Sequence, residues 1–286
     1  MKGKILSVIA GVYTVYLEDK TYINISPKGK FRHLKIKPLV GDFVNVENGV
    51  INEIFPRNNQ LIRPAISNID LGIIVVSLVE PIFSSYLLDK FLTLLKMNHI
   101  DAMVILTKED LYENKDKIEE IVLDYAKINV QVIPFSKKTN LGIEKIRKMI
   151  NGKTIAFMGQ TGVGKSSLIN ALSNDFSRKI GEYSKSLNRG KHQTKEVIIM
   201  PFENSFIADT PGFSSLELNC FKEELKDFFP FFVLKEKDCF FLDCTHINEP
   251  KCEIRRLVDE KIILKEHYNN YRQIYNELIF RKDRFK

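Results

Sequence analysis

The stretch "GQTGVGKSSL", residues 159–168, decides the fold of this 286-residue chain. It matches the pattern G-x-x-x-x-G-K-[ST], in which glycines let backbone N–H groups curl around phosphates and a lysine neutralises them. The apolar stretch "TIAFM" (154–158) precedes it, and the helical pattern "SSLINAL" (166–172) follows. Because a phosphate-binding loop requires this strand–loop–helix context, we expect a nucleotide site here.

The magnesium side of the site is expected downstream of this loop. Lys165 should reach the terminal phosphates, and the Ser166 hydroxyl should bind Mg²⁺. "DTPG" (209–212) ends the apolar stretch "SFIA" about 50 residues after the loop begins. At a strand end, Asp209 is predicted to hold Mg²⁺, and Gly212 is predicted to offer its N–H to a γ-phosphate.

The groups that choose the base are expected upstream of the loop. "LTKED" (106–110) follows the apolar stretch "AMVI", and "PFSKKTNLG" (134–142) follows "VQVI". An acidic side chain such as Asp110 can accept both hydrogen bonds from the N1 and N2 edge of guanine. The alternative for "TKED" is that Thr107 only caps a helix. The predicted GTP-binding residues are Thr107, Lys108, Asp110, Ser136, Lys137, Gly159, Gln160, Thr161, Gly162, Val163, Gly164, Lys165, Ser166, Ser167, Asp209 and Gly212.

Buried apolar stretches alternate with amphipathic helical stretches between residues 65 and 217. This alternation predicts a doubly wound α/β domain. The motifs run in the order base, phosphate, magnesium, whereas an ordinary GTPase runs phosphate, magnesium, base. The sequence therefore predicts a circularly permuted P-loop GTPase, in which the same site is assembled from a chain cut elsewhere.

The two flanks of this domain are basic. Residues 1–63 hold 10 Lys and Arg against 5 Asp and Glu, and residues 260–286 hold 7 against 4. Residues 1–64 carry several short β patterns, which predict an oligonucleotide-binding type of barrel. Basic flanks favour a polyanionic partner, although a generally Lys-rich proteome is the alternative. With no apolar run near the ~18 residues that a membrane helix needs, we expect a cytoplasmic protein without membrane contact.

All four cysteines lie beyond residue 219, and three of them share 14 residues with His246. Cys239, Cys244, His246 and Cys252 form C-x4-C-x-H-x5-C, a set that predicts a closed, tetrahedral, structural zinc site. The alternatives are buried thiols or a redox pair, and Cys220 is expected in the core outside the cluster. The domain 218–286 is thus predicted to be a small zinc-binding domain ending in a basic amphipathic helix, and zinc would supply stability that so small a segment lacks.

The chain resembles the RsgA family (also called YjeQ or YloQ), the small-ribosomal-subunit-dependent GTPases of bacteria. The resemblance rests on "VGDFV", "PRNNQLIRPAISNID", "TKED", "GQTGVGKSSLIN", "RGKHQTK", "DTPGF" and "CFFLDCTHINEPKC". It implies a barrel, a permuted GTPase and a zinc domain, and a role in late maturation of the small subunit. It also implies that Thr194, in "RGKHQTK", closes on Mg²⁺ with Ser166 and Asp209, although Gln193 stands where the family commonly has Thr.

Phe213 follows Gly212, at the place where many GTPases have a glutamine that orients water. An apolar ring cannot do this, so His192 is predicted to orient or activate the water, with Lys165 and Thr194 as the other catalytic residues. We expect a monomeric GTPase that binds GTP and GDP and acts on the small subunit and its rRNA. The rivals are a nucleotide-gated RNA-binding adaptor with incidental hydrolysis, and an ATP-dependent enzyme, which Asp110 disfavours.

Overall fold

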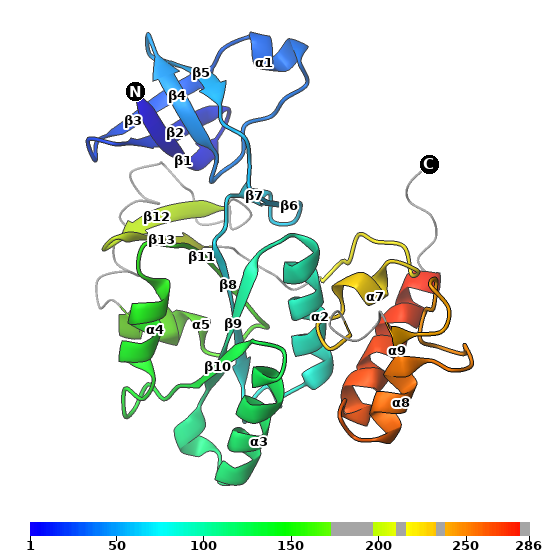
Figure 1. The fold of residues 1–286 in the computed structure, drawn as a ribbon. Helices are drawn as coiled ribbons and strands as arrows, with labels where there is room; N and C mark the ends of the chain where they lie inside the picture. The colour runs from blue at the N-terminus through cyan, green and yellow to red at the C-terminus, as the bar shows by residue number, and fades with distance from the viewer. Residues whose placement is uncertain (173–196, 210–215, 233–237, 281–286) are drawn as a thin grey trace.

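The structure is a computed structural model that describes residues 1–172, 197–209, 216–232 and 238–280, leaving aside the side chains of Arg32 and Asp209. A barrel, an α/β domain and a helical C-terminal segment follow one another along the chain (Figure 1). None of the helices within these ranges is long and apolar enough to cross a membrane.

The first five strands close into a barrel with the order β1-β2-β3-β5-β4. Alternate side chains point inward, since strand side chains have a period of two, and they form a core of their own around Ile5, Val15 and Val44. The predicted barrel is therefore confirmed. Its strands are β1 (Lys2–Ile9), β2 (Val12–Leu17), β3 (Tyr22–Pro27), β4 (Phe43–Glu47) and β5 (Val50–Ile54), with the short helix α1 (Lys30–His33) between β3 and β4.

The α/β domain is built on a six-stranded sheet in the order β10-β9-β8-β11-β13-β12. The five strands from β10 to β13 are parallel, and β12 pairs antiparallel with β13. The central strand β8 is buried throughout because helices cover both faces of the sheet. The strands are β8 (Leu71–Ser77), β9 (Asp101–Thr107), β10 (Gln131–Pro134), β11 (Thr154–Met158), β12 (Ile198–Phe202) and β13 (Ser205–Asp209).

Helices α2 (Ser85–Met97) and α3 (Lys115–Ala126) cover one face of this sheet, and α4 (Ile143–Ile150) and α5 (Lys165–Leu172) cover the other. Each face has its own apolar core. In α2 the buried residues include Leu88, Phe91 and Leu92, which the helical spacing of the sequence places on one face. The predicted doubly wound domain is therefore confirmed.

The C-terminal segment contains α7 (Leu225–Phe228), α8 (Glu253–Asp259) and α9 (Lys265–Phe280). Its buried side chains, among them Phe229, Phe232 and Tyr271, belong to the same apolar core as α2 and α3. Figure 1 shows α9 beside α2. The segment therefore completes the core of the α/β domain, which the cysteine pattern alone did not indicate.

A buried histidine joins α9 to the α/β domain. His267 lies with Nδ1 2.7 Å from Asp89 on α2 and Nε2 2.5 Å from Asp124 on α3. Asp89 also accepts from Asn270 at 2.7 Å and from the Tyr125 hydroxyl at 2.8 Å. Although burial alone would lower it, the two carboxylates raise the pKa of His267 to about 9. At neutral pH the imidazole is therefore a cation held between two acids, which we call the α9 latch.

The segment between the barrel and β8 is tied down along its length. Asp42, fully buried in the barrel, pairs with Arg57 at 2.7 Å and accepts from the Ser67 hydroxyl at 2.6 Å. A short hairpin, β6 (Gln60–Leu61) and β7 (Ile66–Ser67), folds between these two contacts. This segment, "PRNNQLIRPAISNID", is thus an ordered connector, although it is rich in Pro and Asn.

Candidate nucleotide and metal sites

The predicted nucleotide motifs meet at one edge of the sheet. Because parallel strands end at the same edge, the loops after β9, β10 and β11 and the last residue of β13 lie along it. In sheet order these are the Ser136 loop, the "TKED" loop, the phosphate loop and Asp209. The edge therefore places the residues predicted for base, phosphate and magnesium in that spatial order, despite the permuted order in the chain.

The phosphate loop has the backbone that its glycines permit. Gly159 adopts φ +135°, and a Cβ there would lie 2.2 Å from the Val75 carbonyl oxygen, so another residue would be forced out. Lys165 Nζ donates to the carbonyls of Gly159 at 2.7 Å and Gln160 at 2.6 Å. Burial lowers its pKa. The lysine thus folds over its own loop, where incoming phosphates would displace these weaker acceptors.

Thr107 connects the base loop to the phosphate loop. Its buried hydroxyl donates to the Val163 carbonyl at 2.5 Å and lies 3.2 Å from the Val76 carbonyl. The short 3₁₀ helix η1 (Glu109–Leu111) begins after Lys108 and has no side-chain cap. The alternative that Thr107 caps a helix is therefore wrong.

The other predicted base-site residues lie in the loops after β9 and β10. Lys108 has φ +60° and donates through Nζ to the Glu80 carbonyl, whereas Asp110 is exposed in η1. Ser136 is buried, and its hydroxyl accepts from the backbone N–H groups of Lys138 at 3.2 Å and Thr139 at 3.3 Å, next to exposed Lys137. Asp110 is therefore open to solvent, as a group that is predicted to bind a ligand must be.

The predicted switch and water-activating residues lie outside the described ranges. These are His192, Gln193, Thr194, Gly212 and Phe213, together with the side chain of Asp209.

A loop that sequence reasoning passed over, residues 78–84, also borders the site. Pro81 and Phe83 lie with Gln160 and Val163 of the phosphate loop around one small cavity. The Ser77 hydroxyl accepts from the backbone N–H groups of Val79 and Glu80 and so fixes the start of the loop. The loop follows β8 at the same sheet edge, and this position was the signal that could have identified it.

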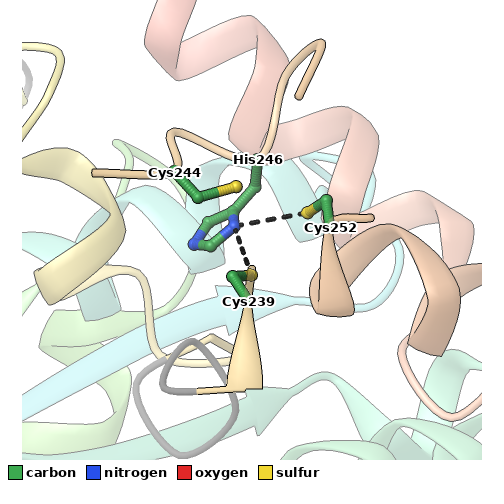
Figure 2. A group of neighbouring side chains, drawn as sticks. All are labelled: Cys239, Cys244, His246 and Cys252. Carbon is green, nitrogen blue, oxygen red and sulfur yellow. Dashed lines mark hydrogen bonds between the residues drawn. The ribbon is translucent and has the colours of Figure 1, made fainter. Parts of the chain in front are cut away.

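The four predicted metal ligands lie together, with their ligand atoms all within 4.8 Å of one another. Figure 2 shows His246 turned toward Cys239 and Cys252, whose sulfurs lie 3.6 and 3.4 Å from Nδ1. Metal–ligand lengths of ~2.3 Å for sulfur and ~2.05 Å for nitrogen predict an S···N edge of about 3.6 Å in a tetrahedron. The two distances from His246 Nδ1 are therefore compatible with a tetrahedral metal site.

Protonation is consistent with a metal site. Burial lowers the pKa of His246 to about 4, so its imidazole is neutral and has a lone pair to give. Burial raises the pKa of the Cys244 thiol to about 12, so that thiol would keep its proton until a binding metal displaced it into solvent.

Groups around the cluster hold its loop in place. The Glu249 carboxylate accepts from the backbone N–H groups of Thr245, Ile247 and Asn248, and hydrogen bonds of this kind lower its pKa to about 2 despite partial burial. From α9, the Tyr268 hydroxyl donates to the His246 carbonyl at 2.8 Å, and Tyr271 donates to the Thr245 carbonyl at 2.7 Å. The helix that carries the α9 latch therefore also supports the metal loop.

Comparisons with known proteins agree with this arrangement. Residues 2–53 match the RsgA N-terminal domain and residues 54–219 the RsgA GTPase model. The small ribosomal subunit biogenesis GTPase RsgA of Geobacillus sp. (strain WCH70) is 41% identical over 99% of both chains. The corresponding protein of Caldanaerobacter subterraneus subsp. tengcongensis is 38% identical over 97% of this chain and 96% of its own.

Two solved structures are similar over nearly the whole chain. YjeQ from Thermotoga maritima aligns with a TM-score of 0.86 at 33% identity, covering 98% of this chain and 99% of its own. YloQ, described as a circularly permuted GTPase, aligns with a TM-score of 0.83 at 37% identity, covering 99% and 96%. With its barrel, its permuted nucleotide edge and its Cys₃His cluster, the chain belongs to the RsgA family of GTPases.

Proposed function

We propose that this protein binds the small ribosomal subunit and hydrolyses GTP to GDP and phosphate during late maturation of that subunit. The observation that carries the proposal is the sheet edge, where the base loop, phosphate loop and Asp209 lie in the spatial order of a GTPase. The two relatives named for small-subunit biogenesis match over 99% and 97% of the chain, so the partner is inferred from them.

In this proposal each part of the edge has one task. Asp110 and Lys108 select guanine, with Ser136 and Lys137 beside the base, while the backbone of residues 159–167 and Lys165 bind the phosphates. Ser166, Thr194 and Asp209 would hold Mg²⁺, which would neutralise part of the phosphate charge. Thr107 fixes the distance between the base loop and the phosphate loop through Val163.

Water activation is assigned to His192, because Phe213 offers no hydrogen bond. His192→Ala should reduce subunit-stimulated turnover by ~100-fold or more, the usual contribution of general acid–base groups, with little effect on GTP affinity. His99→Asn is the matched control, since His99 is exposed on the α/β domain with φ +54°, which Asn tolerates. Unchanged stimulated turnover in His192→Ala would remove this residue from the mechanism.

The remaining assignments follow from the same proposal. The basic barrel, the basic segment 176–195 and α9 would contact rRNA, and Cys239, Cys244, His246 and Cys252 would hold one zinc ion. We assign the limits 1–64, 65–217 and 218–286 to the three domains and expect a cytoplasmic monomer. A metal assay in reducing buffer that finds no stoichiometric zinc would contradict the zinc assignment.

Turnover measured against added partners tests the whole proposal. GTP hydrolysis should rise strongly with purified small subunits, and much less with large subunits or free RNA at equal mass. Lys165→Ala is the negative control, because it removes the charge that faces the terminal phosphates. Active enzyme that small subunits do not stimulate would refute the proposed role.

The rival adaptor remains a measurable alternative because Phe213 stands in the water-orienting position. If hydrolysis is incidental, single-turnover rates should be equal with and without RNA or subunits, while RNA affinity should still depend on the bound nucleotide. Competition of ATP against GTP for binding tests the other alternative, an ATP-dependent enzyme, since Asp110 should make GTP bind much more tightly than ATP.

A further inference from the structure

The barrel and the α/β domain enclose a cleft of about 780 Å³, within the usual range for small-ligand sites. Strands β1, β2 and β4 line one wall, and the turn between β12 and β13 lines the other. The side chains that matter are Lys2, Lys4, Tyr16, Phe43, Phe55 and Phe206, and we call this space the junction cleft.

Aromatic rings and ammonium groups are interleaved in the junction cleft. Lys4 Nζ lies 4.7 Å from the centre of the Phe43 ring and 4.9 Å from that of Phe206, and it donates to Thr154 Oγ1 at 2.5 Å. Lys2 Nζ lies 5.7 Å from the centre of the Phe55 ring. Lys4 is only 3% exposed, so it is a fixed part of the floor, whereas Phe43 is 44% exposed and offers a free ring surface.

The charge of the lining favours an anion. Lys2, Lys4 and Lys20 face two carboxylates, Glu18 and Glu203. Of these, Glu203 pairs at 2.8 Å with Arg147, which does not line the cleft, so the charge of Glu203 is largely neutralised. Exposed rings beside lysines are the arrangement by which proteins hold single-stranded nucleic acid, with a base stacked on a ring and phosphate near the cations.

We propose that the junction cleft binds one unpaired nucleotide of an RNA strand, with its base on the Phe43 ring and its phosphate near Lys2 and Lys20. The cleft lies between two domains and includes residues of the α/β domain, so it is a different site from the nucleotide edge of the sheet. The identification of RNA as the occupant rests on the proposed function, and the site itself rests on the rings and lysines of the cleft.

The position of the junction cleft gives its occupant a route to the GTP site. Glu203 to Phe206, at the turn of the β12–β13 hairpin, form its lower wall. In the chain, β12 follows the predicted switch segment 176–195, and β13 ends at Asp209, the predicted magnesium ligand. A nucleotide in the cleft therefore contacts the one hairpin that joins both γ-phosphate-sensing segments.

Binding of a fluorescent hexa-adenylate RNA to the full-length protein tests the proposal. Saturating GDP is present throughout, so that the phosphate loop is already filled. Phe43→Leu keeps an apolar cover over Lys4 but removes the ring, and should weaken RNA binding about tenfold, as expected when one stacked base loses its platform. Lys20→Asn should weaken it less and reduce the dependence of affinity on salt by about one ion.

Matched controls isolate the junction cleft. Lys35→Asn removes the same charge from another exposed barrel lysine that also has positive φ, 55° against 65° at Lys20. Phe221→Leu removes an exposed ring from the C-terminal segment. Both should bind the RNA like wild type, and circular dichroism should show that all four variants remain folded.

The proposal would be overturned if wild type did not bind the RNA, or if the cleft and control variants lost equal affinity. It would also be overturned if AMP displaced the RNA with an affinity equal to that of the RNA strand, because the occupant would then be a free nucleotide. Photocrosslinking of an RNA carrying one 4-thiouridine should label peptides that contain Phe43 or Phe206, and labelling elsewhere only would also overturn it.

Failure of the cleft can be told apart from failure of the proposed function. Basal GTP turnover should stay unchanged in Phe43→Leu, since no cleft residue belongs to the nucleotide edge, and turnover stimulated by small subunits should fall severalfold. If small subunits stimulate GTP turnover equally in wild type and in Phe43→Leu, the proposal for the junction cleft is refuted and the proposed function is not. A wild type that subunits do not stimulate would refute the proposed function, whatever the RNA result.

Discussion

The two ends of the α/β domain are joined to their neighbours in opposite ways. The barrel keeps most of its core to itself, although Leu6 and Val40 belong to the core of the α/β domain, and it meets that domain across the junction cleft, with Lys4 and Thr154 as a buried polar contact. The C-terminal segment shares one apolar core with α2 and α3 and adds the α9 latch. One junction leaves room for a ligand, whereas the other is filled by the protein itself.

This difference indicates which neighbour can move relative to the α/β domain. A segment that shares most of its core cannot change its position without exposing much apolar surface, whereas a barrel that has most of its core to itself would expose less. We therefore expect the C-terminal segment to unfold together with α2 and α3, and the barrel to respond to ligands in the junction cleft.

Metal removal should have the largest effect, and that effect should be confined to the C-terminal segment and the part of the α/β domain that shares its core. Structural zinc contributes on the order of 10 kcal/mol to small domains, so a zinc-selective chelator should abolish hydrogen-exchange protection in residues 238–280. Because the core is shared, α2 should lose protection too, while strands β1 to β5 keep theirs. Loss confined to residues 239–252 would show that the shared core does not couple the two parts. Cys252→Ser should reproduce the chelator result.

Breaking the α9 latch should come next. His267→Ala leaves Asp89 buried without its cation, while Asp124 keeps Lys127 at 3.1 Å, and loss of one partner of a buried pair costs about 3–5 kcal/mol. The measurement is the free energy of opening of α9 and α2 by hydrogen exchange. His33→Ala, at an exposed histidine of the barrel helix α1, is the control and should change nothing. A cost below about 1 kcal/mol for His267→Ala would mean that the latch adds little to the shared core.

The pH dependence should have opposite signs at the two junctions. The pKa of His267 in the folded protein, about 9, exceeds its ordinary value of 6.5. Its contribution to the free energy of unfolding is therefore full below pH 6.5 and is lost as the pH rises through 9. The total loss is about 3 kcal/mol. Burial lowers the pKa of Lys4 to about 8, although Asp70 opposes this, so its contribution becomes more favourable above pH 8. Opening energies of α9 and of β1 across pH 6–10 test both signs, and His267→Gln should flatten the first curve.

Replacing the buried lysine should have the smallest effect. Lys4→Met keeps the length of the side chain, loses the bond to Thr154, and removes the cost of burying a charge, so barrel stability should change between zero and a gain of about 2 kcal/mol. Thermal unfolding by circular dichroism measures it, with Lys35→Met as the exposed control. A large loss would show that the cation between Phe43 and Phe206 holds the junction together.

Most of the fold, and the grouping of the nucleotide motifs at one sheet edge, could be predicted from local sequence patterns. The phosphate loop, "TKED" and "DTPG" each adjoin an apolar stretch, and parallel strands bring such ends to one edge, so their meeting followed from short-range signals. The metal ligands were predictable for the same reason, since all four lie within 14 residues. The roles of His192 and Thr194 remain predictions.

The junctions could not be predicted, because they join residues that no local pattern connects. Lys4 and Thr154 are 150 residues apart, and His267 and Asp89 are 178 apart. In the sequence, Asp89 is one polar residue in an amphipathic helix and His267 another, so both read as solvent-exposed. Burial depends on which helix packs there, and that is decided by the whole fold.

The distance between α2 and α9 along the chain also has a consequence for biosynthesis. At roughly 5–20 residues per second, the 178 residues that separate Asp89 from His267 take about 9 to 36 seconds to translate. Until α9 follows, the apolar surface of α2, and of α3 once it is translated, lacks the helix that covers it in the folded protein. We therefore expect nascent chains that stop before α9 to expose this apolar surface to other proteins.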